Sequence, residues 1–204
     1  MKILNLYAGI GGNRKLWGDE HEITAVESNW EILKIYKDFF PKDLIVCGDA
    51  HEYLLEHFEE FDFIWSSPPC PTHSRIRRYT SYEKGQVKAA YPDLKLYEEI
   101  LLLKHYFKGK WCVENVIAYY DPLIIPQEFA NHWFWSNFLI RPLENGSREH
   151  HATLENIQKR KGFDLSAYKG IDKTKILRNC VEPETGKRIL EYAINPIKLQ
   201  GELL

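Results

Sequence analysis

Residues 2–18, KILNLYAGIGGNRKLWG, decide the fold of this chain. The apolar run at 2–7 predicts a buried strand, and the glycine-rich stretch AGIGGN that follows it predicts a tight turn. The next stretch, NRKLWG, has the character of a helix. A strand, a glycine turn and a helix in this order form the opening unit of an α/β protein with a parallel sheet.

The same alternation continues along the chain. Apolar runs predict further strands at 22–27, 43–50, 61–67, 110–116 and 132–140. Helical spacing predicts helices at 30–40, around Tyr53, Leu54 and His57, and at 92–108, where Leu94, Tyr97, Leu101 and Lys104 mark one face. Strands that alternate with helices form parallel units with right-handed crossovers, so we predict an α/β class with a doubly wound, mostly parallel sheet.

Two segments lack such a pattern. Residues 71–91 are polar and basic without a clear period, and we expect a long, mobile surface loop there. Residues 144–176 are polar and charged, and the sequence does not predict their structure. With 204 residues, of which 44% are hydrophobic and 27% charged, the chain is expected to form a single soluble domain, residues 1–204.

Charge and cysteine content limit the possible partners. The net charge is −2 and the isoelectric point is about 6.5, so affinity for nucleic acid must come from local patches. The four cysteines, at 47, 70, 112 and 180, form no C-x-x-C pair, and His150-His151 has no second pair at ligand spacing, so we expect no metal. Cys47 and Cys112 lie in apolar strands and are predicted to be buried. The chain shows no signal or spanning segment, which indicates a cytoplasmic protein without a membrane partner.

Three features fall at the carboxyl ends of the first three predicted strands, where doubly wound sheets bind ligands. Gly9, Gly11 and Gly12 leave room for a ligand to approach the backbone. Glu27 closes the second strand, about where an acid that binds ribose hydroxyls is expected, and Asp49 closes the third, placed to reach an adenine amino group. Together they favour an adenosine cofactor, although Asp49 is nearly as well explained as a helix cap.

Two reactive side chains follow the next strands. The stretch SSPPC at 66–70 places Cys70 beyond a strand that prolines stop, and Glu114 ends the strand after it. If these strands are neighbours, a thiolate can add to carbon 6 of a pyrimidine while a protonated carboxyl donates to nitrogen 3, which activates carbon 5 toward a methyl group. We expect Arg75, or the start of a following helix, to raise the thiolate fraction. The alternative is that Cys70 is a small buried hydrophobe.

These stretches resemble the motifs of the DNA cytosine-5 methyltransferases, in that family's order. LNLYAGIGGNRKLWG is similar to the first motif, which binds S-adenosylmethionine, and SSPPC to the Pro-Cys nucleophile motif. ENV at 114–116 is similar to the glutamate motif, and LRNCVEPETG at 177–186 to the last motif, N-x-V-x-P. The resemblance spans residues 3–140 and 176–194 and implies a Rossmann-like, S-adenosylmethionine-dependent methyltransferase that acts on DNA.

The resemblance also implies a role for each matching residue. The cofactor would be held by residues of the first three strand ends, the nucleophile motif and the last motif: Tyr7, Ala8, Gly9, Gly11, Gly12, Glu27, Asp49, Pro68 and Asn179. Cys70 would add to the target ring, Glu114 would hold nitrogen 3, and Asn115 would support the backbone of the active site.

The chain departs from the family at four places. Asn5-Leu6-Tyr7 stands where the family usually has Asp-Leu-Phe, and Pro71 stands where it has glutamine. The arginine motif before the sixth strand has no clear match, and the nearest substitutes are His132 and Arg141. A short insert, residues 141–175, stands in place of a target-recognition region, so sequence readout is expected to be short or supplied by a separate specificity protein.

The expected partner is DNA, either a duplex with a flipped base or a single strand, because a base inside a duplex is out of reach. Phosphate contacts are expected from two clusters, Arg75, Arg77 and Arg78, and Lys159, Arg160 and Lys161, with solvated charged faces as the alternative. A bacterial or phage-encoded enzyme, for instance of restriction-modification, fits these expectations. The competing interpretations are a catalytically silent nucleic-acid-binding subunit, an amino-methyltransferase, whose motif would end in an aromatic residue, and a nicotinamide oxidoreductase. RNA stays open as an alternative substrate.

Overall fold

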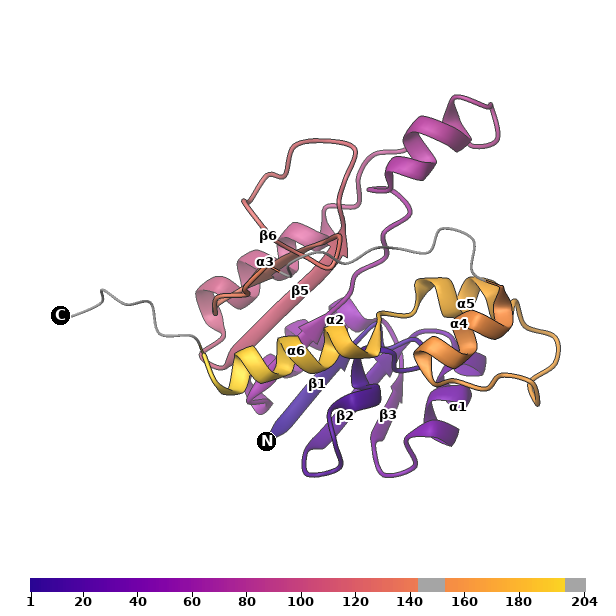
Figure 1. Cartoon of the computed structure of the whole chain (residues 1–204). Helices are drawn as coiled ribbons and strands as arrows, with labels where there is room; N and C mark the ends of the chain where they lie inside the picture. Colours follow the sequence, from indigo (N-terminus) through magenta and orange to yellow (C-terminus); the bar gives the residue numbers. More distant parts are fainter. Residues whose placement is uncertain (143–152, 197–204) are drawn as a thin grey trace.

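The computed structural model of the chain describes residues 1–142 and 153–196. One sheet of seven strands, in the order β3-β2-β1-β4-β5-β7-β6, forms its centre (Figure 1). The parallel strands are β1 (Lys2–Leu6), β2 (Glu22–Glu27), β3 (Leu44–Cys47), β4 (Phe63–Ser66) and β5 (Lys110–Val116). Strand order reverses between β1 and β4, which confirms the prediction of a doubly wound, mostly parallel sheet.

Helices cover both faces of the sheet. They are α1 (Trp30–Phe39), α2 (Ala50–His57), α3 (Lys95–Tyr106), α4 (Leu154–Lys161), α5 (Lys173–Asn179) and α6 (Pro183–Ile194). Leu4 and Leu6 of β1 pack in a core with α2 and α3, whereas Ile3 packs in a core with α6, which crosses the opposite face (Figure 1). The alternating side chains of β1 therefore hold two helical layers together.

The segment whose structure the sequence did not predict is partly helical. After residues 143–152, which lie outside the described residues together with His150-His151, α4 and the residues behind it pack against α1. Ile157, Phe163 and Leu165 join Leu33 and Tyr36 of α1 in one buried cluster. This part of the predicted insert therefore covers the edge of the sheet near β2 and β3.

The far edge of the sheet differs from the prediction. A strand at 132–140 was expected to continue the parallel pattern, but β7 (His132–Ser136) runs antiparallel to β5 and pairs with β6 (Gln127–Phe129), which the sequence did not indicate. Ala130 and Asn131 both have positive φ, 48° and 61°, and reverse the chain in two residues. A hairpin turn of this kind leaves no room for a crossover helix, so the strand must run back.

Three other predictions were wrong in detail. Residues 71–91 are not all loop, because Arg77–Tyr82 forms a π-helix. Helix α3 buries Tyr97 of the predicted stripe together with Leu96, Ile100 and Leu103, whereas Leu94 and Leu101 are exposed. Cys47 is exposed rather than buried, because β3 is the edge strand of the sheet. Within residues 1–142 and 153–196, no helix has the length and apolar character needed to cross a membrane.

Candidate active site

The glycine turn lies at the carboxyl end of β1, beside the end of β2. Gly9 has φ +54°, and its backbone N–H donates to the Glu27 carboxylate at 3.1 Å. A methyl group on Gly9 would meet no atom within 4 Å, so open space lies above the turn. The other Glu27 oxygen accepts from the Asn29 backbone at 2.9 Å, which fixes the carboxylate at the rim of that space. A ligand can therefore reach both the backbone of the turn and an acidic side chain.

The last sequence motif packs directly on this turn. A methyl group on Gly12 would lie 2.3 Å from the Cys180 Sγ and from the Val181 carbonyl oxygen. Behind it, the Trp17 indole N–H donates to the Gly186 carbonyl at 3.0 Å. The connection between α5 and α6 is thus held against residues far away in sequence, and Asn179, at the end of α5, is exposed beside it.

The buried carboxylate of Glu99 contacts the residue that precedes the glycine turn, and the sequence analysis did not identify it. Glu99 of α3 is 1% exposed and accepts from the Tyr7 hydroxyl at 2.6 Å and from the Ser66 hydroxyl at 2.5 Å. His51 Nδ1 lies 3.1 Å from the same carboxylate. Burial and the negative charge of Glu99 raise the pKa of Tyr7, so its hydroxyl stays protonated and donates. Tyr7, whose backbone has φ +55°, is therefore held in place through its side chain.

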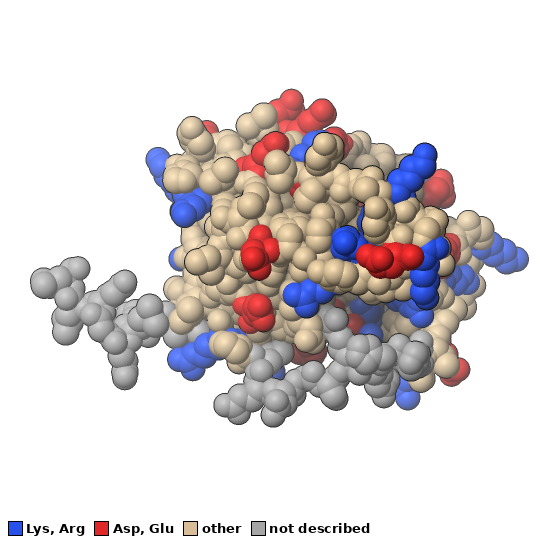
Figure 2. Space-filling view, turned by 90° about the horizontal axis from the view of Figure 1, so that it is seen from above, with Lys and Arg blue, Asp and Glu red and all other residues tan. Residues whose placement is uncertain are grey.

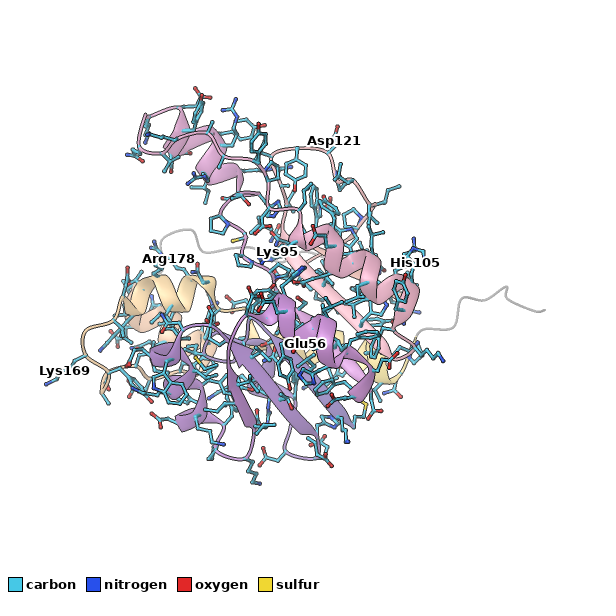
Figure 3. The ribbon with its side chains drawn as sticks, turned by 180° about the vertical axis from the view of Figure 1, so that it is seen from behind. Glu56, Lys95, His105, Asp121, Lys169 and Arg178 are labelled. Carbon is cyan, nitrogen blue, oxygen red and sulfur yellow. The ribbon has the colours of Figure 1, made fainter. Side chains whose placement is uncertain are left out.

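Asp49 is the cap of α2. Its carboxylate accepts from the His51 backbone at 2.8 Å and from the Glu52 backbone at 3.4 Å, and Lys95 Nζ lies 3.5 Å away. Burial opposes ionisation, but these backbone hydrogen bonds outweigh it and lower the pKa of Asp49. The cap explains the residue structurally, and contact with an adenine stays a prediction. Figure 3 shows Lys95 where α3 begins, close to this end of the sheet.

Cys70 follows strand β4, and Glu114 lies near the carboxyl end of the neighbouring strand β5. Strands β4 and β5 pair in parallel, with Ser66 opposite Val113, so Glu114 comes one residue later and Cys70 sits in the turn beyond Ser66. Burial and the charge of Glu114 raise the pKa of the half-buried Cys70 thiol. Because this pKa is raised rather than lowered, the expected increase of the thiolate fraction by Arg75 is not found; the Arg75 guanidinium donates to the Ala118 carbonyl at 2.9 Å.

Asn115 links the two strand ends. Its buried side-chain amide donates to the Pro68 carbonyl at 2.9 Å, and its oxygen accepts from the Val116 backbone at 2.9 Å. The amide thereby holds the backbone that leads into the cysteine turn. His132 Nε2 lies 3.5 Å from the Glu114 carboxylate, whereas Arg141 is an exposed residue beyond β7.

The turn after Cys70 is fastened on its other side. The backbone N–H groups of His73 and Ser74 donate to the Cys70 carbonyl at 3.0 and 3.1 Å. His73 is buried, which lowers its pKa, and its Nδ1 lies 2.5 Å from the Tyr120 hydroxyl. Tyr119 donates its backbone N–H to the His73 carbonyl at 3.1 Å. Both ends of this turn are thus anchored, which fixes the position of the thiol.

The two predicted basic clusters differ. Arg77 donates to the Lys88 carbonyl at 3.1 Å, but the first cluster lies in a segment that projects from the molecule. In the second, Lys159 and Arg160 are exposed, and Arg160 pairs with Glu182 at 2.9 Å.

Lys161 is the residue of the second cluster that the sequence misplaced. Its side chain is 4% exposed, and its ammonium contacts the Cys180 carbonyl and Glu182. The prediction that it binds phosphate is wrong, because the charge is used inside the fold. Among residues 1–142 and 153–196, no group of three His, Cys, Asp or Glu side chains is arranged to hold a metal ion.

Comparison with known proteins adds a sequence relationship. A family model described as C-5 cytosine-specific DNA methylase matches residues 1–101. That range contains the glycine turn, Glu27, Asp49 and Cys70, and it ends before Glu114. The human tRNA (cytosine(38)-C(5))-methyltransferase is 30% identical over 84 residues, which are 38% of this chain and 22% of the human protein. The chain thus spans less than a quarter of that relative's length.

Solved structures extend the likeness in fold. The methyltransferase EhMeth of Entamoeba histolytica superposes with a TM-score of 0.58 and 12% identity, over 96% of this chain and 98% of that one. A mutant of DNMT2 from Spodoptera frugiperda is 28% identical over 56% of this chain and 35% of its own, with a TM-score of 0.39. The first of these comparisons shows a shared fold along nearly the whole chain.

Proposed function

We propose that this chain, whose residues 1–101 match the C-5 cytosine-specific DNA methylase family, transfers a methyl group from S-adenosylmethionine to carbon 5 of a cytosine in nucleic acid. One observation carries the proposal. A half-buried thiol and a carboxyl, Cys70 and Glu114, lie on neighbouring strand ends and interact electrostatically, next to the strand that ends in an open glycine turn.

The open turn fits an adenosine-containing methyl donor. The space above Gly9 admits a ligand against the backbone, and the Glu27 carboxylate at its rim suits a ribose diol. Asp49, Pro68 and Asn179 are the remaining residues proposed to hold the donor. S-adenosylmethionine would supply a methyl group on a positively charged sulfur, which makes that methyl electrophilic.

Glu114 controls when the thiol becomes reactive. In the free protein, burial and the Glu114 charge keep the Cys70 thiol protonated, so it is a poor nucleophile at rest. When a cytosine enters the site, the Glu114 carboxylate takes up a proton from solvent and shares it with nitrogen 3 in a hydrogen bond, so it no longer carries a full negative charge. The thiolate is no longer repelled, and the Cys70 proton can leave to solvent.

The covalent step is an addition of the thiolate to the ring, followed by its elimination. The Cys70 sulfur forms a bond to carbon 6, and the electron pair of the 5,6 double bond moves to carbon 5. Carbon 5 would accept the methyl group from S-adenosylmethionine, which would leave as the neutral thioether S-adenosylhomocysteine, and the carbon 5 proton passes to a water molecule. The double bond re-forms as the carbon–sulfur bond breaks, which returns the thiolate. Asn115 contributes by positioning, because it fixes the carbonyl of Pro68 before the nucleophile.

DNA is the substrate that we favour, since the matching family is described as a DNA methylase family. RNA is the second candidate, because the human relative is named as a tRNA methyltransferase. In a duplex of either kind, the target base must leave the stack to reach Cys70.

The test maps methylcytosine base by base after incubation with S-adenosylmethionine and mixed-sequence DNA, and in parallel with mixed-sequence RNA. We expect product in one of the two, and none with Cys70→Ala. Cys47→Ala is the matched control, because Cys47 is an exposed thiol on β3, and it should act like wild type. The proposal is lost if neither polymer is methylated, or if Cys70→Ala makes as much product as wild type.

A further inference from the structure

Residues 75–91, here called the arm, project from the molecule at the carboxyl end of the sheet (Figures 1 and 3). All of them are described, and none is buried. The arm leaves the body after the Cys70 turn, contains the π-helix Arg77–Tyr82, and returns ahead of α3. It therefore contributes no side chain to the core of the protein.

The arm nevertheless carries large apolar and aromatic side chains. Tyr91 is 94% exposed, Ile76 73%, Tyr79 58% and Tyr82 42%. Apolar surface that the fold does not need marks a binding surface when it is gathered in one place. Tyrosine rings offer flat faces for contact with other flat groups.

A guanidinium group holds two of these rings in place. The Arg78 guanidinium lies 5.4 Å from the centre of the Tyr79 ring and 5.2 Å from that of Tyr82. Arg78 also pairs with Glu83 at 2.5 Å, and the Tyr79 hydroxyl donates to the Tyr119 carbonyl at 3.2 Å. The rings are thus ordered by cation–π contacts and one hydrogen bond without losing their exposure.

The arm is basic in a chain whose net charge is −2. Five of its side chains are basic and one is acidic: Arg75, Arg77, Arg78, Lys84 and Lys88 against Glu83. Figure 2, which views the molecule from above, shows Lys and Arg side chains on the right, where both the arm and helices α4 and α5 lie in Figure 1. Positive charge interleaved with aromatic rings complements a polyanion that carries flat bases.

The arm also leads directly to the proposed nucleophile. Its root is the turn in which His73 and Ser74 donate to the Cys70 carbonyl. A nucleic-acid strand that binds the arm near its root would therefore lie beside the turn that carries Cys70. Inside a duplex the faces of the bases are covered by their neighbours, so tyrosine rings can stack only on unpaired bases.

We propose that the arm binds an unpaired stretch of nucleic acid, with bases stacked on Tyr79, Tyr82 and Tyr91 and phosphates paired with Lys84 and Lys88. The inference rests on the proposed function, which makes nucleic acid the expected ligand, and it deepens that function by naming a single-stranded substrate region.

The test measures binding by fluorescence anisotropy for the full chain without S-adenosylmethionine. The probes are a labelled mixed-sequence DNA strand of about 20 nucleotides, the RNA of the same sequence and the DNA duplex, at about 50 and 200 mM salt. We expect both single strands, or one of them, to bind more tightly than the duplex. Replacing Tyr79, Tyr82 and Tyr91 by Ala should weaken single-strand binding by about 5- to 150-fold for each stack lost.

Three controls separate stacking from other effects. Replacing the same three tyrosines by Phe keeps the rings and should preserve binding. Tyr106→Ala removes an exposed tyrosine from α3, outside the arm, and should change nothing. The midpoint of thermal unfolding should stay constant in every variant, because the arm buries no residue.

The outcomes separate this inference from the proposed function. Three outcomes would overturn the stacking surface. They are equal or tighter binding of the duplex, no binding of any probe, and a triple Ala variant that binds like wild type. Cys70→Ala should bind single strands like wild type, because binding does not use the thiol. Tight single-strand binding without methyl transfer would support the arm and count against the proposed function.

Discussion

Replacing Glu99 by Gln tests whether a buried negative charge holds Tyr7 and Ser66 in place at the candidate active site. The substitution keeps the shape of the side chain and an acceptor for the Tyr7 hydroxyl, and the new amide can donate to the Ser66 hydroxyl. The negative charge is lost, and the Ser66 hydroxyl changes from donor to acceptor in this contact. The structure therefore predicts a change in stability and in its pH dependence without a change of fold.

The magnitude follows from the two buried donors. Hydrogen bonds to a charged group contribute about 1.5–3 kcal/mol, against about 0.5–1.5 kcal/mol for neutral ones, so two bonds lose about 2 kcal/mol together. The amide avoids the desolvation of a buried charge, which offsets part of this loss. We expect Glu99→Gln to lower the free energy of unfolding by about 1–2 kcal/mol. Glu99→Ala, which strands both hydroxyls, should cost about 3–5 kcal/mol.

The pH dependence has a defined sign. The hydrogen bond to Glu99 raises the pKa of His51 in the folded protein, against the effect of burial. A raised pKa stabilises the fold below the unfolded value, which is about 6.5, and this stabilisation is lost as the pH rises through the folded pKa. The difference in unfolding free energy between wild type and Glu99→Gln should therefore shrink as the pH rises from about 6 to about 8.

Urea unfolding at several pH values measures both effects. Glu98→Gln is the matched control, because the Glu98 carboxylate lies 3.2 Å from His51 but is 62% exposed, so its loss should cost less than about 1 kcal/mol. If Glu99→Gln matches Glu98→Gln in stability, or if the difference from wild type does not change with pH, the carboxylate does not organise the site as described.

Three further substitutions test the turn, the thiol and the strand ends. Gly12→Ala should lower the free energy of unfolding by about 1–3 kcal/mol because its methyl would lie 2.3 Å from the chain that follows α5, whereas Gly48→Ala meets no atom within 4 Å and should be neutral; equal thermal midpoints would refute this packing. Glu114→Gln should lower the pKa of Cys70, with burial left as the cause that keeps it raised, so alkylation by iodoacetamide should begin at lower pH; an unchanged profile contradicts the coupling. Asn115→Ala should cost about 1–3 kcal/mol in urea unfolding and lower the rate of methyl transfer, and a variant as stable as wild type would argue against the role of its buried hydrogen bonds.

The order of the parallel strands was predictable because each βαβ unit is encoded locally. The apolar run of β1, its glycine turn and the later strands need only periodicity and turn residues to be recognised. The hairpin of β6 and β7 was not predictable in the same way, because Ala130-Asn131 is not a typical pair for a turn with two positive φ values. The direction of that strand depends on those two residues.

Side chains that act through tertiary contacts were harder to find. Glu99 lies on the buried face of α3 with Leu96, Ile100 and Leu103, a face that the predicted stripe shares only through Tyr97. A carboxylate at apolar spacing is a signal that a buried partner exists, here Tyr7. Lys161 was predicted to contact phosphate but is buried, since a basic run gives no sign that one of its members is buried.

Trapping with 5-fluorocytosine tests the central claim most directly. Fluorine replaces the proton that carbon 5 must lose, so after methyl transfer the sulfur cannot be eliminated and the protein stays attached to its substrate. With S-adenosylmethionine and a polynucleotide that contains the analogue, we predict a covalent complex whose peptide map places the bond on Cys70, and none with Cys70→Ala. A complex that forms on the exposed Cys47, a complex that survives Cys70→Ala, or no complex on either DNA or RNA would contradict the assignment of Cys70 as the nucleophile.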